Sequence, residues 1–493
     1  QLLIFDNVNR NKAIPYSKLK KKVSSISSAK SFDALLIRVN ARVKESLIVD
    51  VNILRPLAYS ELIKVRYKLK KEIVQARILY SKGLVNLSLK LYDNIIKTAE
   101  KFELFDEVIE ALLFKLNFNS SKKKEGKYYE IREKVIMYKK EREYLDDIRF
   151  LVYEYTAKLG VKSEKQILVL SIEKNIRIIY KKQIEVKSCN ALSVLLLMQI
   201  EYCSIIGNTK LLIDSNKKLL NLLVNNPSVY STNRIIYINN EIAYSYVLSF
   251  DFDIARQHLN DALVLFKNNF TRNYINSISI EVTIAIFQHE YHRGDKMIEE
   301  IQLKPVLEKF PIDKSKKSLL KSVRRLRLYD FKESLRLLNE LKEIEKDKEG
   351  WNVWIRIMRI LCSIELLRLN LVDYDIESFR KYIQRLSKDG NINPRVDLIL
   401  KILLELDRRN YNFKEVAQKR KVELTNLKKT TGKYKWDIKS PEMILFHDWF
   451  MAKMENRPYE ANLDPYRKQV ERDESKPLSK TKEKKYRSLG LIA

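Results

Sequence analysis

The sequence predicts an all-α protein, and both its composition and its hydrophobic pattern lead to this prediction. Glycine and proline are scarce, with 9 and 10 residues in a chain of 493. All-β folds place turn residues about every 8–12 positions, and so few breakers cannot supply them. Leu, Lys and Glu, which favour helices, are abundant, and hydrophobic residues make up 45% of the chain. A chain of this length is expected to form several domains or an elongated repeat.

The stretch Asn240–Phe266 has the clearest helical pattern in the chain. Its apolar and small residues recur at helical spacing on both sides of a short break at Ser249–Asp253. Two antiparallel helices approach closely where their facing residues are small, and bulky residues then pack around the contact. The positions that predict such a contact are Ala243, Tyr246, Ala255, Leu259 and Ala262.

These five positions resemble the motif of the tetratricopeptide repeat (TPR), a pair of antiparallel helices that stacks on its neighbours. The motif has small, aromatic, small, bulky and small residues at fixed intervals, and every interval matches here. The resemblance implies a right-handed α-solenoid, in which stacked pairs bury the apolar faces that one pair leaves exposed. It also implies function: TPR proteins as a family are non-catalytic scaffolds that bind peptides or helices of partner proteins.

The same intervals recur elsewhere in the chain with weaker matches. Looser matches begin at Cys203 and Ala285. Two other matches place small residues at both positions of the close helix contact, which Ala243 and Ala255 occupy in the best match. They are Ala76 with Ser88 and Ser322 with Ser334. From residue 203 onward successive matches are 40, 42 and 37 residues apart, longer than the TPR period of 34. The spacing predicts a degenerate TPR-like solenoid of about eight helix pairs between residues 58 and 405, with HEAT-like or other solenoids as alternatives.

The formal net charge of +31 is unevenly distributed over three predicted regions. These are a basic helical N-terminal segment (1–57), the TPR-like solenoid (58–405), and basic C-terminal helices that end in an extended tail (406–493). Their net charges are +7, +15 and +9, so both ends carry more than twice the charge per residue of the middle. A basic surface favours an acidic or polyanionic partner, although a Lys-, Ile- and Asn-rich composition from A/T-rich codons accounts for part of the excess.

Clusters of basic residues are the candidate contacts for such a partner. The candidates are Lys20, Lys21, Lys22, Arg324, Arg325, Arg327, Lys482, Lys484 and Lys485. Tyr434 and Trp436 lie between lysines in the sequence GKYKWD, and aromatic residues among basic ones can bind single-stranded nucleic acid. The alternative interpretation is that these runs are ordinary solvated helix faces.

No known catalytic motif is visible in the sequence. The nine glycines lie far apart, so phosphate-binding glycine loops and the G-x-S-x-G motif do not occur. His289 and His292 are three residues apart, not four as in H-E-x-x-H, and are interpreted as helix-end residues. Trp351 and Trp354 are expected to fill the core. The sequence therefore predicts a protein without enzymatic activity, metal or cofactor.

The cysteines and the hydropathy pattern bear on the compartment. Cys189, Cys203 and Cys362 are odd in number and far apart, so no disulfide framework is predicted and a reducing compartment such as the cytoplasm is favoured. No run of 18 uncharged apolar residues occurs, so no transmembrane helix is expected. Export after removal of a leader is an alternative, because the chain does not begin with Met.

Three functions follow as expectations. The TPR resemblance implies a non-catalytic scaffold or adaptor that holds a partner protein, as a peptide or helix in its concave groove, within a larger assembly. The basic termini favour a second function, the binding of nucleic acid or a ribonucleoprotein. A third is a regulatory TPR protein with a phosphatase site, which would need acidic and amide side chains that converge in one groove.

Overall fold

A computed structural model shows that the protein is all-helical, with no strand among the residues it describes. The predicted all-α class is therefore confirmed. Lys20, Lys21 and Lys22 lie outside the described residues. The structure describes residues 29–49, 61–123, 125–159, 165–186, 188–266, 271–302, 311–341, 343–344, 347, 350–387 and 393–492.

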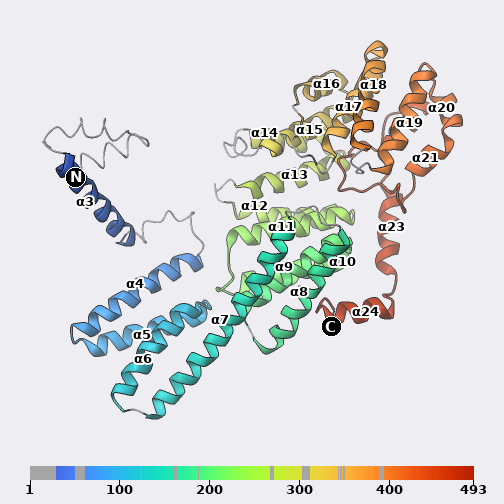
Figure 1. Cartoon of the computed structure of the whole chain (residues 1–493). Coiled ribbons are helices and arrows are strands. Elements are labelled where there is room, and N and C mark those ends of the chain that lie inside the picture. The colour runs from blue at the N-terminus through green and yellow to red at the C-terminus, as the bar shows by residue number, and fades with distance from the viewer. Residues whose placement is uncertain are drawn as a thin grey trace. The chain divides into compact units, whose positions relative to one another are not determined.

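Twenty-two helices follow one another through the described residues (Figure 1). In the first half they are α3 (Ala29–Val49), α4 (Glu61–Ser81), α5 (Val85–Lys101), α6 (Phe105–Ser121), α7 (Glu125–Leu159), α8 (Lys165–Glu185), α9 (Cys189–Ile206), α10 (Thr209–Asn225), α11 (Thr232–Leu248), α12 (Phe252–Val264) and α13 (Arg272–Phe287). In the second half they are α14 (Tyr291–Gln302), α15 (Pro311–Arg327), α16 (Phe331–Glu340), α17 (Trp351–Glu365), α18 (Leu369–Ser387), α19 (Pro394–Arg408), α20 (Phe413–Lys419), α21 (Lys421–Leu427), α22 (Phe446–Glu455), α23 (Asp464–Ser475) and α24 (Lys480–Ser488).

Residue contacts divide the chain into two compact units. Unit 1 comprises residues 1–153, 182–192 and 225–231. Unit 2 comprises residues 154–181, 193–224 and 232–493. The predicted boundary between residues 405 and 406 lies within unit 2.

The helices pack in adjacent antiparallel pairs, which is the arrangement of a helical repeat. In unit 1, α4 packs on α5 and also contacts α6. In unit 2 the pairs are α11–α12, α13–α14, α15–α16 and α17–α18. The first helices of successive pairs also touch, because α11 contacts α13, α13 contacts α15, and α15 contacts α17. Each pair thus buries the apolar face that its neighbour exposes.

Small residues form the close helix contacts that the sequence predicts. The Ser88 hydroxyl on α5 donates to the Ala76 carbonyl on α4 at 2.8 Å. The Ser334 hydroxyl on α16 donates in the same way to the Ser322 carbonyl on α15 at 2.9 Å. In α11–α12 the contact residues Ala243 and Ala255 are fully buried, and the exposed fraction of Leu259 and Ala262 is at most 1%. Three hairpins therefore share one contact geometry.

The hairpin turns share a backbone geometry as well. Between α11 and α12, Phe250 has a left-handed φ of 60°, and the Asp251 N–H donates to the Tyr246 carbonyl at 2.9 Å. The equivalent bonds run from Leu84 to Leu79, from Asp330 to Arg325 and from Arg368 to Ser363. Such a bond satisfies carbonyls at the end of the first helix and reverses the chain within three residues.

These turn bonds correct the predicted repeat register in two hairpins. The acceptor in α11–α12 is Tyr246, which occupies the aromatic position of the motif. In α13–α14 the Glu290 N–H donates to Ala285, and in α9–α10 the Asn208 N–H donates to Cys203. The sequence predicts that Ala285 and Cys203 occupy the first small position of the motif, which lies three residues before the residue that accepts the turn bond. In the structure Ala285 and Cys203 are themselves the acceptors. The predicted register is therefore wrong by three residues in these two hairpins.

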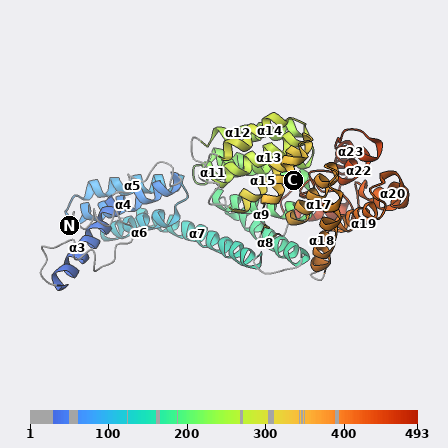
Figure 2. The ribbon, with the colours of Figure 1, turned by 90° about the horizontal axis from the view of Figure 1, so that it is seen from above.

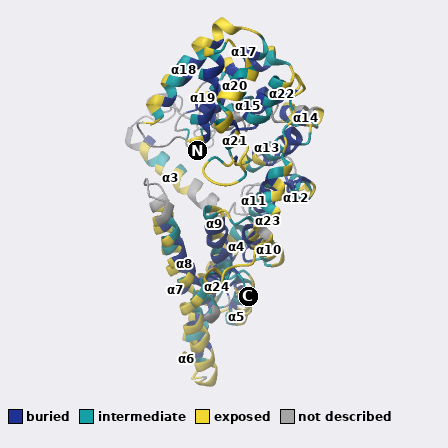
Figure 3. Ribbon diagram, turned by 90° about the vertical axis from the view of Figure 1, so that its right-hand side faces the viewer, coloured by how far each residue is buried: buried dark blue, intermediate teal, exposed yellow. Residues whose placement is uncertain are grey.

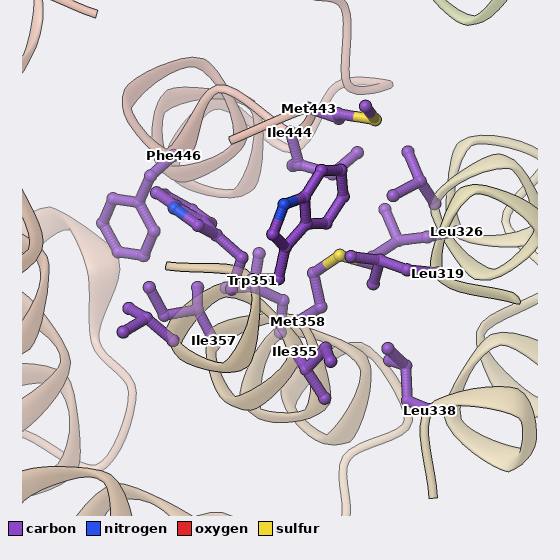
Figure 4. Close-up of a cluster of buried hydrophobic side chains, with 14 of the residues drawn as sticks. Leu319, Leu326, Leu338, Trp351, Ile355, Ile357, Met358, Met443, Ile444 and Phe446 are labelled. Carbon is purple, nitrogen blue, oxygen red and sulfur yellow. The ribbon is translucent and has the colours of Figure 1, made fainter. Parts of the chain in front are cut away.

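The largest core lies in unit 2 and centres on α17. Trp351 and Trp354 are buried there, as predicted. Figure 4 shows Leu319 and Leu326 of α15 to one side of α17, with Met443 and Ile444 above Trp351 and Phe446 beyond them. Buried residues cover most of α17 and α19 (Figure 3). Residues 443–446, which follow the repeat helices in the sequence, therefore complete the core that those helices form.

The end of the chain is folded, and the prediction of an extended tail is wrong. Residues after Pro465 form most of α23 and all of α24. Figure 2 shows α22 beside α17 and α19 in unit 2, where Phe446 and Trp449 join their core, whereas Tyr466 of α23 packs against the α11–α12 hairpin. Tyr486, Leu489 and Leu491 are buried, although their neighbours are polar. Three apolar side chains thus hold a segment whose composition suggested solvent exposure.

Candidate protein-binding surface

The C-terminal residues 442–492, here called the strap, follow the ends of several first helices in unit 2. Figure 1 shows α23 leading towards α24, and the end of the chain contacts α8 and α9. In order from α19 back to α8, the contacts of the strap are Glu442 with Arg395, Trp449 with Glu365, Tyr459 with Arg327, Arg467 with Phe250, Leu489 with Gln199 and Lys485 with Glu173. From Glu442 to Arg467 the strap thus contacts the array in reverse chain order, and its end contacts α8 and α9.

The middle of the strap is held by charged and aromatic side chains. Glu365, the last residue of α17, accepts from Trp449 Nε1 at 2.8 Å and from Lys453 Nζ at 2.9 Å. The Arg327 guanidinium at the end of α15 lies 4.8 Å from the centre of the Tyr459 ring. Arg467 Nη2 donates to the Phe250 carbonyl at 2.9 Å. Side chains and a backbone carbonyl at the ends of repeat helices thus hold the middle of the strap.

The end of the strap combines apolar anchors with one ion pair. Lys485 Nζ lies 2.5 Å from Glu173 Oε1, and the Glu173 side chain is only 7% exposed. Gln199 Nε2 donates to the Leu489 carbonyl at 2.7 Å. Leu489 and Leu491 are buried beside these polar contacts. Lys485 of α24 and two leucines that follow the helix thus anchor the end of the strap.

A groove of about 570 Å³ lies beside the strap in unit 2 and is called the turn groove. It is bounded by α10, the turns of α11–α12 and α13–α14, and α23. Its basic residues are Lys210, Lys217 and Arg467, and its acidic residues are Asp214, Asp251, Asp253 and Glu471. Both signs of charge thus line one groove, with Tyr246 and Gln288 between them.

Tyr246 links the repeat motif to the turn groove. The sequence assigned this residue to packing alone, but it is half-buried and its hydroxyl accepts from Lys217 Nζ at 2.7 Å. Its ring is parallel to that of His258, with the centres 6.1 Å apart. Burial lowers the pKa of His258, whose Nδ1 lies 3.0 Å from Asn239 Oδ1, so the imidazole is neutral at pH 7.

Unit 1 has a groove of its own, of about 510 Å³, between α5, α6 and α7. Lysines and carboxylates alternate along it, and several of them pair with one another. Lys115 forms an ion pair with Asp93, and Lys134 Nζ lies 3.2 Å from Glu130 Oε1. Ion pairs on a protein surface contribute little to stability, so these pairs add little to the packing of α5, α6 and α7.

The structure separates the predicted basic candidates into two groups. Arg324 and Arg327 are buried, and burial lowers the pKa of Arg324 to about 10. Arg325 lies 3.8 Å from Asp330, and Lys485 pairs with Glu173. These four side chains therefore serve the fold, whereas two others on α24, Lys482 and Lys484, are exposed.

The residues considered for metal or phosphatase chemistry do not converge. No group of three or more His, Cys, Asp or Glu side chains is placed to hold a metal ion in the part of the chain that the structure describes. His289 lies in the α13–α14 turn with a φ of 61°. An acidic pocket contains Asp448 and Asn462, but Asp448 accepts from the Asn462 backbone N–H at 2.8 Å and lies 3.0 Å from His447 Nδ1. These contacts hold the local loop together.

One described helix, Cys189–Ile206, is long and apolar enough to cross a membrane by length and composition. A helix in a protein core meets the same two criteria, and half of this one is buried inside the protein. Glu201 lies within it and is 3.3 Å from the Tyr155 hydroxyl. It packs as one helix of the array.

The strap is the structural feature that the sequence did not predict. Its partners lie 217 residues away for Arg467 and 290 residues away for Leu489. The available signal was the spacing of Tyr486, Leu489 and Leu491 at a lysine-rich end of the chain. No model of a known protein family matches the chain, and no curated protein matches it at a significant level.

Proposed function

We propose that the chain is a non-catalytic, TPR-like scaffold that holds a partner protein, and that the partner binds in the turn groove. In this proposal the described hairpins belong to a right-handed solenoid of about eight helix pairs. The three cysteines are free thiols, which suits a reducing compartment such as the cytoplasm.

The strap is the observation that carries this proposal. It is a chain segment of several short helices, held on the ends of the repeat helices by single ion pairs and a few buried side chains. Helical repeats commonly use their extended surfaces for protein binding. Here the same array already holds one helical segment of its own chain.

The turn groove fits a partner segment that carries both signs of charge. Lys210 and Asp214 lie one helical turn apart on α10, and both are exposed. Across the groove, α23 presents Arg467 and Glu471 with the same spacing. Complementary charges select a partner and its orientation, and a mismatched pair costs affinity. A partner with alternating acidic and basic residues is therefore favoured.

An exchange of two charges tests the groove without changing the net charge. We would purify the partners of the wild-type chain by affinity capture and mass spectrometry, and then repeat the capture with Lys210→Glu/Asp214→Lys. The matched control is Lys381→Glu/Glu377→Lys, an exposed ion pair with the same spacing on α18. We expect the groove variant to lose a partner that the wild type and the control retain. Equal recovery with all three proteins would overturn the assignment of this groove.

A further inference from the structure

Residues 428–439, between α21 and α22, form a second basic surface, called the basic loop, which is separate from the turn groove. It contains five exposed lysines: Lys428, Lys429, Lys433, Lys435 and Lys439. None of them forms an ion pair with a carboxylate of the described residues. Elsewhere many lysines and arginines are paired, as Lys401 is with Asp397 at 2.8 Å. The loop therefore concentrates five exposed ammonium groups. The carboxylates nearest to them lie outside the loop: Lys428 lines the pocket that contains Asp448, and Lys435 helps to lower the pKa of Asp473.

Buried contacts hold the backbone of the loop in place. Trp436 is 2% exposed, and its Nε1 donates to the Glu442 carbonyl at 3.0 Å. The Arg395 guanidinium donates to the carbonyls of Leu427 and Tyr434 at 2.8 and 2.7 Å. The loop is thus fixed at Leu427, Tyr434 and Trp436, and its lysines project from a defined backbone.

The single carboxylate within the loop is engaged locally. Asp437 Oδ1 accepts from the Lys439 backbone N–H at 2.9 Å, which fixes the turn. Lys433 Nζ lies 5.0 Å from the centre of its neighbour's ring, that of Tyr434, which is half-buried. The loop therefore presents ammonium groups but no exposed aromatic ring.

We infer that the basic loop binds the sugar-phosphate backbone of a nucleic acid without reading its sequence. Protein interfaces are depleted in lysine and depend on aromatic or arginine anchors, and the loop exposes neither. Phosphate contacts need only positive charges on a suitable surface, which this loop provides. Base stacking is not expected, because Trp436 is buried and the Tyr434 ring is half-buried beside Lys433.

A binding assay with charge-matched variants tests this inference. The loop variant changes Lys428, Lys429, Lys433, Lys435 and Lys439 to Gln. The control changes five exposed lysines that are scattered over other helices, Lys90, Lys218, Lys296, Lys332 and Lys414, to Gln. Both variants lose the same charge, so a difference between them reports the position of the lysines. Circular dichroism and thermal unfolding check that each variant is folded.

The probes are labelled mixed-sequence RNA and DNA single strands of about 20 nucleotides, read by fluorescence anisotropy. We expect both to bind the wild type, and log K to fall linearly with log salt concentration. The loop variant should lose at least about tenfold in affinity and show a shallower salt slope, and the control should change by less than about twofold. Equal losses in both variants would overturn the inference, because net charge alone would then explain binding.

Two further probes separate nucleic acid from other anions. A labelled poly-glutamate peptide represents an acidic protein, and vesicles with phosphatidylserine represent an anionic membrane. We expect each to bind more weakly than RNA at the same salt concentration and with less dependence on the five loop lysines. If either binds as tightly as RNA and loses binding in the loop variant, the loop recognises that class instead and the inference is wrong.

Discussion

The backbone of Gly490 lies against the ring of Tyr180, so closely that a β-carbon at residue 490 would approach the ring to 2.5 Å. Gly490 also has a left-handed φ of 66°. We predict that Gly490→Ala detaches the end of the strap, because both the steric contact and the backbone conformation oppose a side chain. The measurement is hydrogen exchange of residues 480–492, which should become faster in the variant.

Gly83→Ala is the matched control for this prediction. Gly83 has a similar φ of 79°, but no atom lies within 4 Å of a β-carbon built there. Its substitution should destabilise the α4–α5 hairpin by about 1–2 kcal/mol, the cost of a left-handed backbone conformation for alanine. Exchange in α24 should be unchanged in this control. If α24 remains equally protected in Gly490→Ala, the close contact with Tyr180 does not determine how the strap is held.

The second prediction concerns the helix contact in α11–α12. Ala243 and Ala255 are fully buried at the closest approach of the two helices. We predict that Ala255→Trp destabilises the protein by more than about 3 kcal/mol, because the indole has no space without separation of the helices. Thermal unfolding measures the effect, and the loss should extend to the adjacent pair α13–α14.

Ala255→Ser is the control for overpacking at this position. The corresponding residues of α5 and α16 are Ser88 and Ser334, both fully buried with hydrogen-bonded hydroxyls. We therefore expect the serine variant to retain most of the stability. A tryptophan variant that unfolds at the same temperature as the wild type would show that the close contact is not required.

The parts of the fold that were predictable from sequence depend on local intervals. The contact between Ala243 and Ala255 spans twelve residues, so a short motif was sufficient to identify it. The register failed at Cys203 and Ala285 because small residues also occur at the acceptor position of the turn, and composition cannot distinguish the two positions. Turn hydrogen bonds, which are set by backbone conformation, decide the register.

The candidate surfaces were less predictable, because burial and pairing determine which charges are available. Arg324 and Arg327 belong to a conspicuous basic run, yet α15 turns both towards buried surroundings. The sequence around Trp436 alternates lysines and aromatic residues, a pattern that can bind nucleic acid. In the structure, however, the Trp436 side chain is buried and donates to the Glu442 carbonyl. A charge count along the sequence does not show which side chains the fold has already used.

A third prediction concerns the buried ion pair that supports the basic loop. Arg395 and Glu442 are each 1% exposed and form two hydrogen bonds of 2.8 Å. We predict that Glu442→Ala costs about 3–5 kcal/mol, because it leaves a buried guanidinium without its carboxylate. The double variant Arg395→Met/Glu442→Leu should be more stable than this single variant, since it removes both charges.

Urea unfolding of the single and double variants measures this coupling. Glu377→Ala, which removes one partner of an exposed pair on α18, is the control and should cost less than about 1 kcal/mol. A double variant that is no more stable than Glu442→Ala would contradict the prediction. It would indicate that Arg395 acts mainly through the carbonyls of Leu427 and Tyr434.

The last prediction is a pH dependence centred on Glu405, whose side chain is 1% exposed. Lys419, followed by Arg420 and Arg409, lowers the pKa of this carboxyl from 4.5 to about 2. A pKa that is depressed by folding means that the ionised carboxylate stabilises the fold above about pH 4.5, and that this contribution is lost as the pH falls towards 2. Glu405→Gln should therefore be less stable than the wild type at pH 6, and the difference should shrink as the pH falls through this window. Denaturant midpoints across that range measure it, and parallel curves for the two proteins would show that the three basic side chains do not stabilise the carboxylate.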